Sequence, residues 1–503
     1  MAEFRLPPTT KPKFRFHRMQ KDDLVWEKLE KDTDQWEESI RTREVYDAVG
    51  NFILKYKQAP AEAMHVAIRG GYNTVYRLEY KDGSSVIMRV PIKDVVSFPE
   101  ERVLYEVATT RYVAAHTTIP VPHIYHHGTA AENPTGLGPF IIMDYIDHDD
   151  NMCVALLDPN TPKAERPVLN PNITEEKLEF LYGQMANILL QLSTLRFPRI
   201  GSLVEKKDEN SISVEGRPLI GNMNCIAVHT NIPENMLPSQ TYASSDEWYR
   251  ALSDMHMAQL VFQHNDAVDD KEDALDKYVA RQLSRNLATE GRLVPALSES
   301  DGEFRLFSED FRPSNVLLDE DQRVVGVIDW EFAYAAPAQF SFDPPWWLLI
   351  HDPEYWTGGY SEWLKAYEPR LQTFLRVLEA EERKMAATDL AEKLNAISLT
   401  GSGKTEPPLS QRMRESWEKR TWMLNYAARK SWAFDFLWWR FLDESFFGPN
   451  EKQDHQARLA LLSEPQRKAM EPFVERKMKE RGNRQMIKWD EKDAADRLAE
   501  VLV

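Results

Sequence analysis

The chain has 503 residues, enough for two or three domains of ordinary size. Lys and Arg total 62 against 80 Asp and Glu, so the formal net charge is −18, which argues against a nucleic-acid partner held through its phosphates. Apolar residues make up 42% and aromatic residues 11% of the chain, which excludes wholesale disorder. The acidic balance is compatible with a cationic small-molecule partner.

The cysteine content and the length of the apolar runs indicate in which cellular compartment the protein is expected. The two cysteines, Cys153 and Cys225, are too few for a disulfide scaffold or a Cys-based zinc site. No apolar run approaches the ~20 residues that span a bilayer, and the first residues lack the apolar stretch of a secretory signal. We therefore expect a cytoplasmic protein without a membrane partner.

The N-terminal third of the sequence changes from helical to strand-like patterning. Residues 1–22 combine basic residues with prolines and are expected to form a flexible arm. Apolar residues at helical spacing predict a helical region over 23–57. Alternating patterns over 74–80 and 86–90, joined by a turn with an Asp-Gly pair, predict a β-hairpin.

A helix and a strand are expected to follow the hairpin. Ser97 and Glu100 have the spacing of a capping box, with a proline in the first turn, which predicts a helix from there to about residue 116. A short apolar strand over 140–143 then ends at the polar segment 144–147. We expect the boundary between two lobes near residues 144–150.

The remainder of the chain is mostly helical by pattern. Helices are expected over 174–295, with loops near 198–247, and again over 355–503, with a polar loop near 400–411. The coarse architecture is therefore a small mixed α/β lobe followed by a large helical lobe.

The short β-rich unit 304–332 carries the residues best suited to chemistry. Asp310 is followed after five residues by Asn315, then by an apolar strand, a turn and a second apolar strand that ends in Asp329. Phosphoryl transfer uses a carboxylate that accepts the proton of the attacking hydroxyl, together with oxygen ligands that hold Mg²⁺. Taken alone, the segment could also be a polar turn between buried strands.

Two glycine-containing segments could bind phosphate. Gly70 and Gly71 precede the first hairpin, where the absence of Cβ lets the backbone approach phosphate oxygens, although a plain turn is the alternative. The segment 401–405 has the Gly-Ser-Gly-Lys-Thr sequence of a P-loop, but Ser398 occupies the position of the first glycine. We interpret that segment as a flexible polar loop.

The sequence resembles the aminoglycoside phosphotransferase and choline kinase-like family, in particular a large fungal group of phosphotransferases. The resemblance depends mainly on Phe-Arg-Pro-Ser-Asn-Val-Leu at 311–317 and Gly-Val-Ile-Asp-Trp-Glu-Phe at 326–332, and extends from about residue 23 to residue 475. Supporting phrases lie at 197–203, 344–349 and 425–435.

The resemblance implies an α+β, bilobal protein-kinase-like fold that uses ATP and Mg²⁺. The N-lobe, a small mixed antiparallel sheet with helices, would occupy 23–147, and the mostly helical C-lobe would occupy 148–503 with its catalytic loop at 308–332. By the same resemblance, Asp310 would be the catalytic base. Asn315 and Asp329 would be the metal ligands.

The nucleotide-binding residues are also implied by the resemblance. Arg89 stands where kinases place a lysine on the nucleotide phosphates, and Glu106 resembles the acidic partner of that cation. A surface ion pair is the alternative for these two. The full expected set is Gly70, Gly71, Asn73, Arg89, Glu106, Asp144, Tyr145 and Ile146, of which the last three would present backbone groups to the adenine edge.

The leading hypothesis is transfer of the γ-phosphoryl group of ATP to a hydroxyl of a small molecule. The sequence departs from the family at Arg89 in place of lysine, at Ser308 in place of histidine and at Glu309 in place of glycine. These departures keep a nucleotide-binding or scaffold protein with little catalysis as an alternative, and ATP-dependent carboxylate activation as a third. Aromatic clusters in the C-lobe could form an apolar wall of the acceptor-binding site, although core packing is the more common role of Trp. Asp343, Glu331 and Asp435 could add negative charge there.

Overall fold

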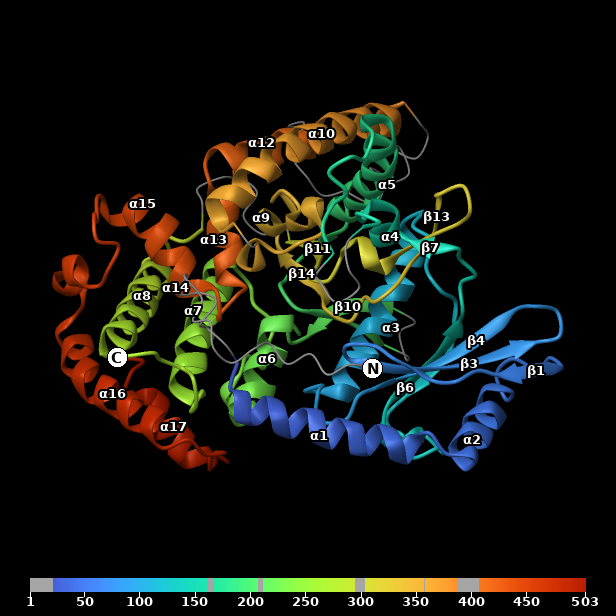
Figure 1. Ribbon diagram of the computed structural model, residues 1–503, viewed down its shortest axis with the longest axis horizontal. Coiled ribbons are helices and arrows are strands. Elements are labelled where there is room, and N and C mark those ends of the chain that lie inside the picture. Colours follow the sequence, from blue (N-terminus) through green and yellow to red (C-terminus); the bar gives the residue numbers. More distant parts are fainter. Residues whose placement is uncertain (1–20, 161–166, 207–210, 295–303, 357, 388–406) are drawn as a thin grey trace.

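The computed structural model has a sheet-containing N-lobe and a larger helical C-lobe (Figure 1), which confirms the expected α+β class. The structure describes residues 21–160, 167–206, 211–294, 304–356, 358–387 and 407–503. Residues 1–20 of the arm expected over 1–22, and the P-loop-like segment 401–405, lie outside the described residues.

The N-lobe is built on a six-stranded antiparallel sheet in the order β1-β3-β4-β6-β5, with β2 paired to β3. The expected hairpin is confirmed as β3 and β4, and its turn contains Gly83 at φ 84°, a left-handed conformation that glycine adopts without strain. The strands are β1 (Ala61–Met64), β2 (Ile68–Arg69), β3 (Asn73–Tyr80), β4 (Ser85–Pro91), β5 (Ile124–Gly128) and β6 (Phe140–Asp144).

Helix α3 (Pro99–His116) packs against this sheet through Val103 and Val107, which meet Ile141 and Met143. The expected capping box is wrong. Phe98, at φ 55°, is the N-cap and makes no side-chain capping bond, while the backbone N–H of Ser97 donates to Asn224 Oδ1 at 2.8 Å. Proline at the first helical position starts the helix one residue later than the capping pattern predicts.

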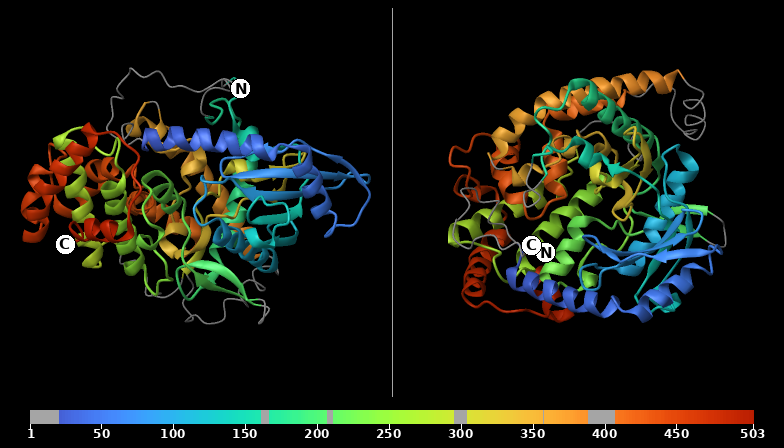
Figure 2. Two further views of the ribbon diagram at one scale, coloured as in Figure 1. Left: turned by 90° about the horizontal axis from the view of Figure 1, so that it is seen from below. Right: turned by 45° about the vertical axis from the view of Figure 1, so that its right-hand side comes forward.

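The helical region expected over 23–57 is two helices, α1 (Asp23–Ile40) and α2 (Arg43–Ile53), because Thr42 caps a new helix. Helix α2 packs its apolar face on the sheet. Helix α1 runs from α6 in the C-lobe to the sheet (Figure 1; Figure 2, left), and the side chain of Asp22 before it accepts the backbone N–H of Asn265 at 3.0 Å. The start of α1 is therefore attached to the C-lobe, whereas the sequence interpretation placed all of it in the N-lobe.

The C-lobe is mainly helical around one large hydrophobic core. Its helices are α4 (Met152–Leu156), α5 (Glu175–Ser193), α6 (Gly221–Thr230), α7 (Ser245–Phe262), α8 (Lys271–Thr289), α9 (Ala338–Ser341), α10 (Tyr360–Ala386), α12 (Leu409–Glu418), α13 (Thr421–Ala428), α14 (Phe434–Leu437), α15 (Asp443–Phe447), α16 (Glu464–Gly482) and α17 (Glu491–Ala499). No described helix combines the length and apolarity required to cross a bilayer.

The segment 198–247, expected as loops, contains α6 and an antiparallel hairpin of β9 (Ser202–Lys206) and β10 (Ser211–Gly216). Strand β9 packs against α3, so this hairpin depends on a tertiary contact that local patterning does not report.

Two small three-stranded sheets position the expected catalytic segment. In one sheet, β12 (Val316–Leu318) pairs with β13 (Val324–Val327) and with β7 (Asp150–Asn151). In the other sheet, β11 (Phe304–Ser308) pairs with β14 (Ala333–Pro337) and with β8 (Arg196–Phe197). The loops 309–315 and 328–332 connect these two sheets.

Candidate active site

Asp310 and Asn315 are held together in the loop that follows β11. The side-chain amide of Asn315 donates to the carbonyl oxygen of Asp310 at 2.9 Å and to its Oδ2 at 3.2 Å. The backbone N–H of Ile328 donates to the carbonyl oxygen of Asn315 at 3.0 Å. Because Asp329 follows Ile328 directly, the β12–β13 hairpin brings Asn315 and Asp329 to the same end.

Arg89 links the N-lobe sheet to Asp329. Its Nη1 lies 3.2 Å from Asp329 Oδ1, and its Nη2 forms an ion pair with Glu106 of α3. The side chains of Arg89 and Glu106 are only 9% and 4% exposed, so this is not a surface ion pair. Asp329 itself has φ 69°, a left-handed backbone conformation that a non-glycine residue adopts only when its surroundings enforce it.

Burial and neighbouring negative charge raise the pKa values of Asp329 and Asp310. Burial raises the pKa of Asp329 to about 7; the charges of Glu331 and Asp310 add to this shift, and Arg89 opposes it. Burial also raises the pKa of Asp310, against the effect of Arg312, whose Nε lies 2.9 Å from Asp310 Oδ1. A cation bound among these groups would relieve the repulsion.

The donor set at the hairpin end fits a magnesium ion. The amide nitrogen of Asn315 is engaged by Asp310, and in the part of the chain that the structure describes its Oδ1 accepts no hydrogen bond. The described residues of the chain contain no group of three or more His, Cys, Asp or Glu side chains that could hold a metal ion. Asn315 and Asp329 would therefore supply two oxygen ligands. Phosphates and water would supply the others, as is usual for Mg²⁺.

The glycine turn lies against the segment that follows Asp329. The backbone N–H of Gly70 donates to the carbonyl oxygen of Asn73 at 2.7 Å, which closes the turn. The side-chain amide of Asn73 donates to Glu331 Oε2 at 3.2 Å, and Tyr72 meets Phe332 edge-on with 5.5 Å between ring centroids. The expected phosphate-binding turn is thus attached to the expected metal-binding loop.

Arg102 is a site residue that the sequence interpretation missed. Its Nη1 lies 3.1 Å from Glu331 Oε2, and the two side chains are 3% and 0% exposed. Its guanidinium also stacks on the rings of Phe332 and Tyr72, at 4.2 and 5.0 Å from their centroids. Arg102 precedes Glu106 by four residues, a helical spacing that places both on one face of α3 and could have identified it.

The segment between the lobes contacts both of them. The backbone N–H of Tyr145 donates to the carbonyl oxygen of Ser85 at 3.1 Å, and Tyr125 donates its hydroxyl to Asp144 Oδ1 at 2.7 Å. Ile146 packs on the backbone of Gly326 in β13, where an added Cβ would lie 2.5 Å from Ile146 Cδ1. The three expected adenine-edge residues therefore join the N-lobe sheet to the β12–β13 hairpin.

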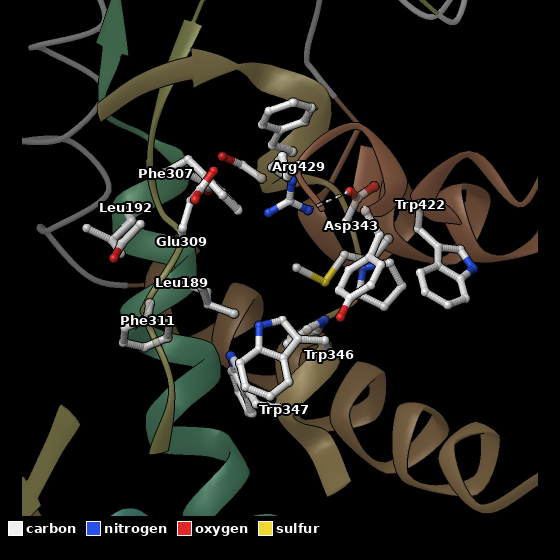
Figure 3. Close-up of a pocket in the computed structure, with 18 of the residues that line it drawn as sticks. Leu189, Leu192, Phe307, Glu309, Phe311, Asp343, Trp346, Trp347, Trp422 and Arg429 are labelled. Atoms are coloured by element: carbon white, nitrogen blue, oxygen red, sulfur yellow. Dashed lines mark ion pairs between the residues drawn. The ribbon is translucent and has the colours of Figure 1, made fainter. Parts of the chain in front are cut away.

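A pocket of about 70 Å³ lies beside the expected catalytic loop in the C-lobe (Figure 3). Its wall is largely apolar and aromatic. Glu309 and Phe311 line it, and Asp310 between them does not. Trp346, Trp347 and Trp422 belong to the wall, whereas other tryptophans of the expected clusters, such as Trp363 and Trp438, are fully buried in the core.

The three acidic residues considered for the acceptor have different surroundings. Asp343 lines the pocket, and Glu331 contacts Arg102 and Asn73. Asp435 forms a buried ion pair with Arg281 and is therefore part of the core.

Comparison with known proteins identifies a family. A model described as the phosphotransferase enzyme family matches residues 65–378, more than half of the chain. Two subtelomeric hrmA-associated cluster proteins from two strains of Aspergillus fumigatus are 28% and 27% identical over 139 residues, which is 28% of this chain and 24% of each relative. The matched part of the chain thus spans about a quarter of the length of these curated relatives.

Solved structures resemble the chain at low identity. Macrolide 2'-phosphotransferase MphH from Brachybacterium faecium is 13% identical, with 81% of this chain and 99% of that chain covered and a TM-score of 0.36. Plasmodium vivax ethanolamine kinase is 10% identical, with 84% of this chain and 81% of that chain covered and a TM-score of 0.34.

Proposed function

Because the chain belongs to the phosphotransferase enzyme family, we propose that it transfers the γ-phosphoryl group of ATP to a hydroxyl group of a small molecule, with Mg²⁺ as the required metal. One observation supports this proposal above the others. The β12–β13 hairpin groups Asn315 and Asp329 beside Asp310. Arg89 of the N-lobe reaches the carboxylate of Asp329.

Each residue has a role that follows from its chemistry. Asp310 would accept the proton of the attacking hydroxyl, since Asn315 of the same loop fixes the orientation of its carboxylate. Asn315 and Asp329 would hold Mg²⁺, which when bound neutralises charge on the nucleotide phosphates. Arg89, held by Glu106, would donate its remaining N–H groups to those phosphates.

The departures from the family pattern are compatible with an ordered catalytic loop. The backbone N–H of Glu309 donates to the carbonyl oxygen of Phe332 at 3.2 Å, and Glu309 Oε2 accepts the backbone N–H of Gly221 at 2.9 Å. Ser308 keeps its place opposite Ala333 in the β11–β14 pair. These contacts support the enzyme over a scaffold in which the loop has lost its geometry.

A metabolite-library screen for acceptor-stimulated ADP formation tests the proposal. The wild type should form ADP together with a phosphorylated acceptor, and Asp310→Asn should bind ATP with similar affinity but lose turnover. Binding of ATP without turnover on any acceptor would instead favour the scaffold alternative. ADP formation that yields an acyl phosphate would favour carboxylate activation. Wild-type turnover in Asp310→Asn would show that Asp310 is not the base.

A further inference from the structure

The pocket beside the catalytic loop contains a guanidinium with unused donors. Arg429 donates through Nε to the carbonyl oxygen of Asn425 at 3.0 Å, and its guanidinium stacks on Phe307 and Phe340 at 4.6 and 4.8 Å from the ring centroids. Its Nη2 is 3.7 Å from Asp343 Oδ2, too far for a hydrogen bond. Within the described residues Nη1 makes no hydrogen bond, and Figure 3 shows the guanidinium facing the hollow of the pocket.

A carboxylate oxygen on the same pocket wall also lacks a partner. Glu309 uses Oε2 to accept the backbone N–H of Gly221 at 2.9 Å. Its Oε1 is buried and has no hydrogen-bond partner among the described residues. Leaving a buried acceptor without a hydrogen bond is unfavourable, so a donor group of a ligand would be stabilised there.

The guanidinium of Arg429 and the carboxyl group of Glu309 lie over an apolar floor. Burial raises the pKa of Glu309, and the nearby charge of Arg429 opposes this shift and favours the ionised carboxylate. Figure 3 shows Glu309 and Asp343 on opposite sides of Arg429, with Trp346 and Trp347 below them. A ligand with only a positive charge would face the guanidinium, and a ligand with only a negative charge would face the two carboxyl groups. Charge complementarity therefore favours a head group that carries both charges.

We propose that this pocket binds the head group of a hydroxylated α-amino acid, with its carboxylate on Arg429 Nη1 and its ammonium on Glu309 Oε1. The inference rests on the proposed phosphotransferase function and names its substrate class. Glu309 and Phe311 line the pocket on either side of Asp310 in the sequence, so a ligand anchored there lies beside the loop that carries the base.

The reaction on such an acceptor balances without a further reactant. The hydroxyl oxygen of the amino acid forms a bond to the γ-phosphorus, and the bond from that phosphorus to the bridging oxygen breaks. The electron pair of that bond leaves with ADP, and the hydroxyl proton passes to Asp310.

Matched acceptors on the wild-type enzyme separate the head-group charges. One set is L-homoserine, 3-aminopropan-1-ol and 4-hydroxybutanoate, and a second is L-tyrosine, tyramine and 3-(4-hydroxyphenyl)propanoate. In each set the second compound lacks the carboxylate and the third lacks the ammonium. ADP release and the mass of the phosphorylated product give kcat/KM for each compound. We expect the amino acid of at least one set to exceed both analogues at least tenfold.

The outcomes distinguish the inference from the function on which it rests. Turnover of either analogue as fast as the amino acid, or turnover confined to other library acceptors, overturns the amino-acid pocket and leaves the phosphotransferase intact. No turnover on any compound in the sets or the library overturns both.

Variants at two pocket residues add a readout at the residues themselves. Arg429→Gln should raise KM for the amino acid at least tenfold with little change in KM for the amine, and Arg429→Lys should recover part of the loss. Glu309→Gln should raise KM for the amino acid and for the amine, with little change in KM for the analogue that lacks the ammonium group. Arg412→Gln, an arginine of α12 outside the pocket lining, is the matched control. Equal losses on all three compounds would contradict the assignment.

Discussion

The buried ion pair between Arg102 and Glu331 should hold the two lobes together. Arg102→Met keeps most of the side-chain volume and removes the charge, so that among the described residues Glu331 would retain only Asn73 as a partner. Both charged side chains are almost fully enclosed, and removing one partner of such a pair costs about 3–5 kcal/mol. We expect a loss of unfolding free energy in this range.

The same change should weaken nucleotide binding, because Arg102 also stacks on Tyr72 in the glycine turn. Adding Glu331→Gln should restore at least half of the lost stability, since a neutral amide no longer leaves a buried charge unpaired. The assay is urea denaturation of the wild type, the two single variants and the double variant, analysed as a double-mutant cycle. A loss below about 1 kcal/mol for Arg102→Met, or strictly additive effects, would refute the reasoning.

Two further predictions concern packing and charge. Gly326→Ala should lower both the melting temperature and ATP affinity, because the added Cβ would overlap Ile146. Gly71→Ala has open space around its Cβ and should change the melting temperature little. The opposite order in a thermal-shift assay would contradict the packing of Ile146 on Gly326. Burial raises the pKa of Asp343 from 3.8 to about 7, so the folded state takes up a proton that the unfolded state lacks between these pH values. The resulting stabilisation is complete below about pH 4 and is lost as pH rises through 7. The free energy of unfolding of Asp343→Asn should therefore rise relative to that of the wild type as pH increases from 5 to 8. If urea denaturation gave the same difference between the two proteins at every pH in this range, the predicted sign would be contradicted.

Local patterns were sufficient to predict the strands that build the site. The alternation on either side of Asp82-Gly83 gives β3 and β4, and the two apolar runs around residue 320 give β12 and β13. Each of these hairpins closes over a short turn, so the residues that pair lie close in the sequence. The expected positions of Asn315 and Asp329 follow from the second hairpin directly.

Contacts between distant segments were not predictable in the same way. Arg102 and Glu331 are 229 residues apart, and Asp22 and Asn265 are 243 apart, so neither pair leaves a local pattern. The pocket likewise combines Glu309 with Arg429, which the sequence analysis had included only within a family phrase. Long-range packing selects these partners, and the local patterns of a single sequence do not indicate which distant residues will pack together.

The central claim is that Asn315 and Asp329 hold a divalent metal together with a nucleotide. Titration of Mn²⁺ in the presence of ADP, followed by the electron paramagnetic resonance of the free ion, measures this directly. Asp319→Asn, at the opposite end of the β12–β13 hairpin, is the matched control and should bind Mn²⁺ as the wild type does. The account predicts at least tenfold weaker binding for Asn315→Ala and for Asp329→Asn. Wild-type affinity in both of these variants would contradict it.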